Sequence, residues 1–197
     1  MIQSKLTQLF MDNNGIITAK LAKKHGIDDS TLRKAVDRND IIKHSRGIFL
    51  LDESHQDDLY IIQLKYPKGV YSHETAVMLH WLTTNYPFTY HVSFPRDYHL
   101  ATAEEQSIKP YYLPHKELDE EYIVELESWD GNPLRVTNLE KTIIDMMRYK
   151  HATPGIIKEM LDDYLDRDDH DFRRLERYAR ELNIEELVKE KILSILN

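Results

Sequence analysis

The sequence predicts an α+β fold, in which an amino-terminal winged helix-turn-helix is followed by an α+β domain with a helical carboxyl-terminal region. Three observations predict this arrangement. Helical periodicity in the first part of the chain gives way to a β-rich hairpin, short strand-like runs follow in the middle, and the carboxyl-terminal third has helical patterns. We therefore expect a winged helix in residues 1–52 and a second domain in residues 55–197.

Two short helices are expected first. Apolar residues at helical spacing predict one within residues 2–10. Thr18 is a good N-cap for a second helix over residues 19–25, and Gly26 stands where a left-handed residue commonly ends a helix.

A third helix and a hairpin complete the expected domain. Either Asp28 or Asp29 can cap this helix, which we expect to run to about Arg38. Two β-rich runs then flank the turn Ser45-Arg46-Gly47, where glycine can adopt a positive φ. Because a hairpin directly after such a helix is typical of a wing, the segment is predicted to be a winged helix-turn-helix.

The face of the third helix opposite Leu32 is polar and basic. In a winged helix-turn-helix such a face enters the DNA major groove, and the wing reaches nearby phosphates. Solvated charge on a small helical domain is the simpler alternative. The candidate DNA-binding residues are Thr18, Ser30, Thr31, Arg33, Lys34, Arg38, Lys43 and Arg46.

Charge is divided unevenly along the chain. The 197 residues carry a formal net charge of −8, which argues against a nucleic-acid partner for the chain as a whole. Residues 1–51, however, have a net charge of +4, whereas residues 52–197 have a net charge of −12. Only the amino-terminal part is therefore expected to hold phosphate.

Composition excludes several classes of protein. The absence of cysteine excludes disulfides, thiol nucleophiles, iron–sulfur clusters and thiolate zinc sites. No apolar run approaches the roughly 18 residues of a membrane span, and the first ten residues lack signal-peptide character. We expect a cytoplasmic protein with no membrane partner.

The second domain is expected to mix helices and strands. Ser72 is the expected N-cap of one helix, and Thr137 with Glu140 forms an apparent capping box for another. Further helices are expected over residues 55–66, from Thr153-Pro154, and over residues 169–182 and 185–196. Short strands are expected at residues 90–94, 111–113, 122–126 and 134–136.

Patterns typical of enzymes are weak. His73 and His80 are seven residues apart, and Val77 stands where a zinc protease would place its second histidine. Glu125 and Glu127 could belong to a metal-dependent nuclease, but a solvated strand face has the same pattern. The acidic stretch 162–171 is more simply a solvated loop than a surface for a basic partner. We expect no catalytic residues, no metal site and no cofactor.

Four segments in order resemble the AbiEi family of antitoxins: GIITAKLAKKHGIDDSTLRKAVDRNDIIKHSRGIFLL, GVYSHETAVMLHWLT, YHVSFPRDY and RVTNLEKTIIDMMRY. The resemblance covers most of residues 15–149. It implies an antitoxin of a bacterial type IV toxin–antitoxin, or abortive infection, pair.

Several functional expectations follow from this resemblance. The winged helix would bind double-stranded operator DNA and act as a repressor of its own operon. The second domain would counteract a nucleotidyltransferase-like toxin, which AbiEi antitoxins oppose without forming a stable complex with it. The alternative is a stand-alone winged-helix transcriptional regulator whose second domain senses a ligand or dimerises.

Overall fold

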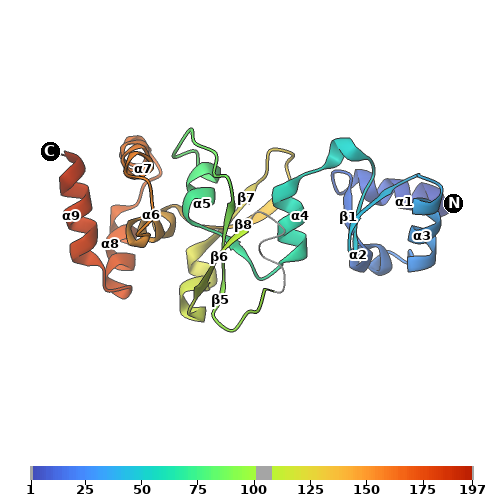
Figure 1. Ribbon diagram of the computed structural model, residues 1–197, viewed down its shortest axis with the longest axis horizontal. Coiled ribbons are helices and arrows are strands. Elements are labelled where there is room, and N and C mark those ends of the chain that lie inside the picture. The colour runs from blue at the N-terminus through green and yellow to red at the C-terminus, as the bar shows by residue number, and fades with distance from the viewer. Residues whose placement is uncertain (1, 101–107, 197) are drawn as a thin grey trace. The chain divides into compact units, whose positions relative to one another are not determined.

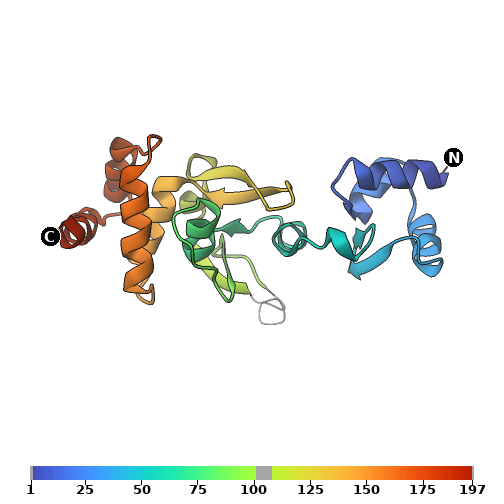
Figure 2. The same ribbon diagram turned by 90° about the horizontal axis from the view of Figure 1, so that it is seen from above.

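A computed structural model of the chain describes residues 2–100 and 108–196 (Figure 1; Figure 2). The chain divides into two compact units. Unit 1 comprises Met1–Pro67 and Glu127–Leu134, and unit 2 comprises Lys68–Leu126 and Arg135–Asn197. The first unit thus extends past residue 52 and includes a segment that is distant in the sequence.

Unit 1 contains the predicted helices and hairpin. A three-stranded antiparallel sheet has the order β1-β3-β2. Strand β1 was not predicted, because a three-residue strand has no measurable periodicity and its partner, β3, lies far along the chain. The elements are α1 (Ile2–Met11), β1 (Ile16–Thr18), α2 (Ala19–Lys24), α3 (Asp29–Asp37), β2 (Ile42–Ser45), β3 (Ile48–Leu50), η1 (Glu53–His55) and α4 (Asp58–Lys65).

Two apolar clusters stabilise unit 1. In one, Phe10 of α1, Ala22 of α2 and Leu32 of α3 are buried together. In the other, Ile61 of α4 packs with Ile48 of the small sheet. Because α4 buries its apolar side chains against this sheet, it belongs to the same compact unit as the winged helix.

Hydrogen bonds connect residues 127–134 with the rest of unit 1. The buried carboxylate of Asp57 accepts hydrogen bonds from Ser128 Oγ at 2.5 Å and from Asn132 Nδ2 at 2.8 Å. Asn14 Nδ2 in turn donates to Asn132 Oδ1 at 3.2 Å. A buried carboxylate that lost these donors would be costly, so the contacts hold the segment in place.

The larger sheet has the strand order β6-β5-β4-β8-β7. Strand β4 is antiparallel to β5 and parallel to β8, and β5 is parallel to β6. The strands are β4 (Val70–Tyr71), β5 (Tyr90–Pro95), β6 (Ile108–Leu113), β7 (Ile123–Glu127) and β8 (Pro133–Thr137). The two-residue strand β4 was not predicted.

Helix α6 is central to unit 2. Its side chains from Leu139 to Met147 are all buried, and it contacts α5, α7, α8 and α9 (Figure 1). The helices of this unit are α5 (His73–Leu79), η3 (His115–Leu118), η4 (Glu120–Tyr122), α6 (Leu139–Arg148), α7 (Pro154–Asp166), α8 (Phe172–Glu181) and α9 (Glu185–Leu196). The α+β fold with a helical carboxyl-terminal region is thus confirmed.

The expected capping box of α6 was wrong, whereas Ser72 is the N-cap residue of α5, as expected. The N-cap of α6 is Asn138, whose side chain accepts from the backbone N–H of Lys141, and the Glu140 carboxylate instead binds Arg174. Ser72 makes no capping hydrogen bond, because its hydroxyl bonds Ser93 Oγ at 2.7 Å. In both places a contact from elsewhere in the fold replaces the local one.

Three expected boundaries also differ. The segment 55–66 contains η1 and the shorter α4, and α8 begins at Phe172 rather than at residue 169. The first half of the acidic stretch 162–171 belongs to α7, so only its second half is a loop. No helix in the described parts of the chain has the length and apolar character needed to cross a membrane.

Candidate nucleic-acid interface

Helix α3 has one buried and one exposed face. Leu32 is 1% exposed and Ala35 is 0% exposed, and both pack in the core of unit 1. By helical periodicity, the face opposite Leu32 carries Ser30, Lys34, Asp37 and Arg38, and all four side chains are exposed. Arg33, at the flank, is exposed as well.

Hydrogen bonds to Asp28 fix the start of α3. Asp28 Oδ1 accepts from the backbone N–H of Thr31 at 2.7 Å and from Ser30 Oγ at 2.9 Å, so Asp28 rather than Asp29 is the N-cap. The bond from Thr31 lowers the pKa of Asp28 and keeps the cap ionised. Ser30 thus has a local role besides the predicted contact with DNA.

The wing carries two exposed basic side chains, Lys43 and Arg46. Gly47 ends its turn with a φ of +77°, a conformation that glycine adopts without strain. The carbonyl of Gly47 accepts from the backbone N–H of Ala19 at 2.8 Å, which anchors the turn to the start of α2. A β-bulge follows Lys43, which pairs with Phe49 of β3.

A groove of about 280 Å³ connects α3 with the wing. Arg33 from the helix and Lys43 from the wing both border it, so cations from two elements face one concave surface. Its lining residues are Ala19, Asp29, Leu32, Arg33, Val36, Lys43, Gly47 and Phe49.

Two other candidates have partners within the protein. The Arg38 guanidinium forms an ion pair with Asp40 at 2.7 Å, with 54% of the arginine side chain exposed. Thr18 Oγ1 accepts from the backbone N–H of Leu21 at 3.1 Å and caps α2, as expected. Arg38 must therefore exchange Asp40 for phosphate if it binds DNA.

The segment that contains α3 and the wing matches a known protein family. Residues 4–51 match the family model described as transcriptional regulator, AbiEi antitoxin. The amino-terminal segment is similar to this antitoxin family. The resemblance predicted from the sequence is thereby confirmed for this segment, and the match supports a role as an antitoxin and transcriptional regulator.

A solved structure extends the fold comparison beyond the AbiEi segment. The crystal structure of the RV2827C protein from Mycobacterium tuberculosis aligns with a TM-score of 0.58 and 15% sequence identity. The alignment covers 90% of this chain and 70% of that chain, so both proteins share the fold. No curated protein matches the sequence.

In the described parts of the chain, the residues of the weaker enzyme patterns are not gathered at a metal site. His80 Nε2 bonds the carbonyl of Thr137 at 2.7 Å, and His73 Nδ1 bonds Ser72 Oγ at 2.9 Å. Glu125 and Glu127 are exposed on β7. In residues 2–100 and 108–196, no three histidine or carboxylate side chains are placed to hold a metal ion.

Sequence reasoning missed a buried ion cluster in unit 2. Lys141 is 0% exposed, and its ammonium lies 2.5 Å from Asp145 Oδ1 and 4.0 Å from Glu117 Oε2. Arg148 Nη1 also binds Glu117, at 2.6 Å. Spacing of i, i+4 between Lys141 and Asp145 was visible in the sequence, but it is equally typical of an exposed helix face.

A histidine–tyrosine cluster in unit 2 combines the buried His73 and His91 with the half-buried Tyr111 and Tyr149. His73 stacks on Tyr111 with 3.6 Å between ring centroids, and Tyr111 Oη lies 3.1 Å from His91 Nδ1. Burial lowers the pKa of His73 from 6.5 to about 4. Burial, reinforced by His73, lowers the pKa of His91 to about 3. Both imidazoles are therefore neutral at pH 7.

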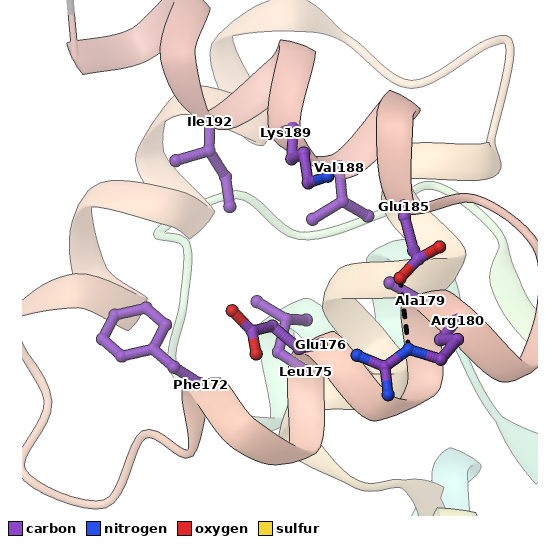
Figure 3. A pocket seen from close by; sticks show the side chains of 9 residues that line it. All are labelled: Phe172, Leu175, Glu176, Ala179, Arg180, Glu185, Val188, Lys189 and Ile192. Atoms are coloured by element: carbon purple, nitrogen blue, oxygen red, sulfur yellow. Dashed lines mark hydrogen bonds and ion pairs between the residues drawn. The ribbon is translucent and has the colours of Figure 1, made fainter.

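A groove of about 380 Å³, lined by both apolar and charged side chains, lies between α8 and α9 (Figure 3). Leu175 of α8 faces Val188 and Ile192 of α9 across it. An ion pair between Arg180 and Glu185 at 3.3 Å connects the two helices at its edge. Acidic and basic side chains both line this groove, so its charges favour neither an anionic nor a cationic ligand.

Proposed function

We propose that the protein is an AbiEi-type antitoxin and transcriptional autorepressor that binds operator DNA through α3 and the wing. The observation that carries this proposal is the groove shared by Arg33 and Lys43 within the segment that matches the AbiEi family. Cations on two elements can contact phosphates on both sides of a groove while α3 reads base edges. Lys34 of α3 and Arg46 of the wing are two further exposed basic side chains of this segment.

The experiment measures binding to DNA from upstream of the protein's own gene, at two salt concentrations, against an unrelated fragment of equal length. Phosphate contacts make affinity fall with salt, and specificity is the ratio between the two fragments. We expect selective binding and a decrease of the salt slope by about 0.9 for each phosphate contact removed.

The matched variants are Lys34→Ala with Lys43→Ala, and Lys5→Ala with Lys116→Ala as a control of equal charge. All four lysines are exposed. The first pair should weaken binding and flatten the salt dependence, whereas the control pair should bind as the wild type does. Equal affinity of the two pairs for operator DNA would refute the proposed interface.

We propose that unit 2 counteracts a nucleotidyltransferase-like toxin. The full chain is the appropriate test protein, because residues 127–134 belong to unit 1 and a fragment of residues 55–197 would lose the hydrogen bond from Asn14 to Asn132. The Lys34→Ala, Lys43→Ala chain, co-expressed with the toxin gene from the same locus, should restore growth although it no longer represses. If the locus encodes no toxin, the stand-alone regulator becomes the better proposal.

A further inference from the structure

A groove of about 570 Å³ in unit 2 is bordered by lysines. We call it the lysine-rimmed groove. It lies among the end of α6, the start of α7 and α9, and among the described residues that line it none is acidic. Its lining residues are Met147, Tyr149, Lys150, Ala152, Pro154, Ile157, Lys158, Leu187 and Lys191.

The floor of the lysine-rimmed groove is apolar and only partly covered. Met147 is buried, whereas Ala152, Ile157 and Leu187 keep part of their surface exposed. Covering partly exposed apolar side chains removes them from water, at about 25 cal/mol for each Å² buried. The floor therefore favours a partner with apolar side chains of its own.

The rim has the opposite charge from the unit around it. Unit 2 has a net charge of −7, yet Lys150, Lys158 and Lys191 border this groove. Lys158 forms an ion pair with Asp162 at 2.9 Å, with 65% and 49% of the two side chains exposed. An exposed pair of this kind is weak, so Lys158 can turn to another carboxylate at little cost.

We propose that the lysine-rimmed groove binds an amphipathic helix of a partner protein, with apolar side chains on one face and carboxylates along its edges. An apolar floor accepts the apolar face of such a helix, and the rim lysines complement the carboxylates. The groove is open to solvent, so it encloses no small molecule as a ligand cavity does.

Nucleic acid fits the lysine-rimmed groove less well. Tyr149 is the only aromatic residue among its described lining residues, and Lys109 Nζ lies over the Tyr149 ring at 4.8 Å. The edge of Tyr149 also packs against His73, with 5.5 Å between ring centroids. A base would have to displace these neighbours to stack on the ring, and the remaining acidic surface of the unit repels phosphate.

The test is a selection of displayed helical peptides on the immobilised full-length protein. Peptides of about 16 residues carry fixed leucines at positions i, i+3, i+4 and i+7, and the flanking positions vary among Asp, Glu, Lys, Arg and Ser. We expect enrichment of Asp and Glu at the flanks. The selected peptide is then labelled, and its affinity for the purified protein is measured by fluorescence anisotropy.

Three variants, each checked for folding by circular dichroism, assign the binding surface. Lys150→Glu with Lys158→Glu should weaken peptide binding on the order of tenfold. Leu187→Gln should weaken it through the floor, and Lys68→Glu with Lys116→Glu, an exposed control pair in unit 2, should change it less than about twofold.

Several outcomes would overturn the proposal. These are enrichment of basic flanks, no enrichment at all, or equal losses in the rim and control pairs. The same holds if the rim pair weakens binding of labelled DNA but leaves the peptide unaffected, because the rim would then contact nucleic acid. Operator binding by unit 1 is measured separately, so failure here leaves the proposed function untouched.

Discussion

Lowering the pH from 7.5 to 5.0 should destabilise unit 2 through its two buried, neutral histidines. His73 has a folded-state pKa of about 4 and His91 of about 3, against 6.5 for an ordinary histidine, and burial is the main cause in both cases. Below pH 6.5 the unfolded chain binds protons that the folded unit does not. The contribution of the two histidines to the free energy of unfolding is therefore fully present above that pH and is lost as the pH decreases toward 4.

The size of this destabilisation follows from the difference between the solution pH and the ordinary pKa of histidine. Each pH unit within the window corresponds to 1.36 kcal/mol per group, so at pH 5.0 each histidine should lower the free energy of unfolding by about 2 kcal/mol. Acting independently, the pair would remove about 4 kcal/mol, a large part of the stability of an ordinary domain. Burial also lowers the pKa of His80, which acts in the same direction.

Urea unfolding of a Trp129→Phe chain measures this loss in the relevant unit. The sequence contains two tryptophans, Trp81 in unit 2 and Trp129 in unit 1, so the substitution leaves Trp81 as the fluorescent reporter. Midpoints and slopes at pH 7.5, 6.5, 5.8 and 5.0 give the free energy of unfolding as a function of pH.

Replacing one buried histidine tests whether these histidines cause the pH dependence of the free energy of unfolding. His91→Gln should remove about half of the pH dependence, because a glutamine at this position takes up no proton. His115→Gln is the control, since 71% of the His115 side chain is exposed. A free energy of unfolding that is equal at pH 7.5 and 5.0, or a pH dependence unchanged by His91→Gln, would refute the reasoning.

Substitutions at three further positions test an ion pair, a helix cap and a close backbone approach. Asp145→Asn should lower the free energy of unfolding, measured in urea, by about 3–5 kcal/mol, because it leaves the buried ammonium of Lys141 without its closest carboxylate. A loss below about 1 kcal/mol would contradict a buried ion pair. Asp28→Ala should cost about 1 kcal/mol by removing the N-cap of α3, whereas Asp28→Ser should retain most of it. Gly15→Ala should lower the thermal midpoint of unit 1, since φ is +75° and a Cβ there would lie 1.9 Å from the ring of His55; an unchanged midpoint would contradict this close approach.

Local signals made the winged helix predictable from sequence. Asp28 caps α3 through residues three positions away, and Gly26 and Gly47 adopt the positive φ values that their positions suggested. The exposed basic face of α3 followed from helical periodicity applied to Leu32. The match over residues 4–51 covers these same elements.

Features set by distant partners could not be predicted in this way. Strand β4 exists because Tyr71 pairs with Val136, and a two-residue strand carries no pattern of its own. Lys141 is buried because Glu117 and Asp145 neutralise it, although a lysine within a helix is normally expected at the surface. The ion pair of Arg38 with Asp40 was also missed, because helical periodicity gives the direction of a side chain but not its partner.

The polar contacts of Asp57 with Ser128 and Asn132 have a consequence during synthesis. A ribosome that has released residues 1–67 has not yet produced all of unit 1, because residues 127–134 follow only after most of the larger sheet's strands. At roughly 5–20 residues per second, the Asp57 carboxylate waits several seconds for its hydrogen-bond donors. The two units therefore mature as interleaved segments of one nascent chain rather than one after the other.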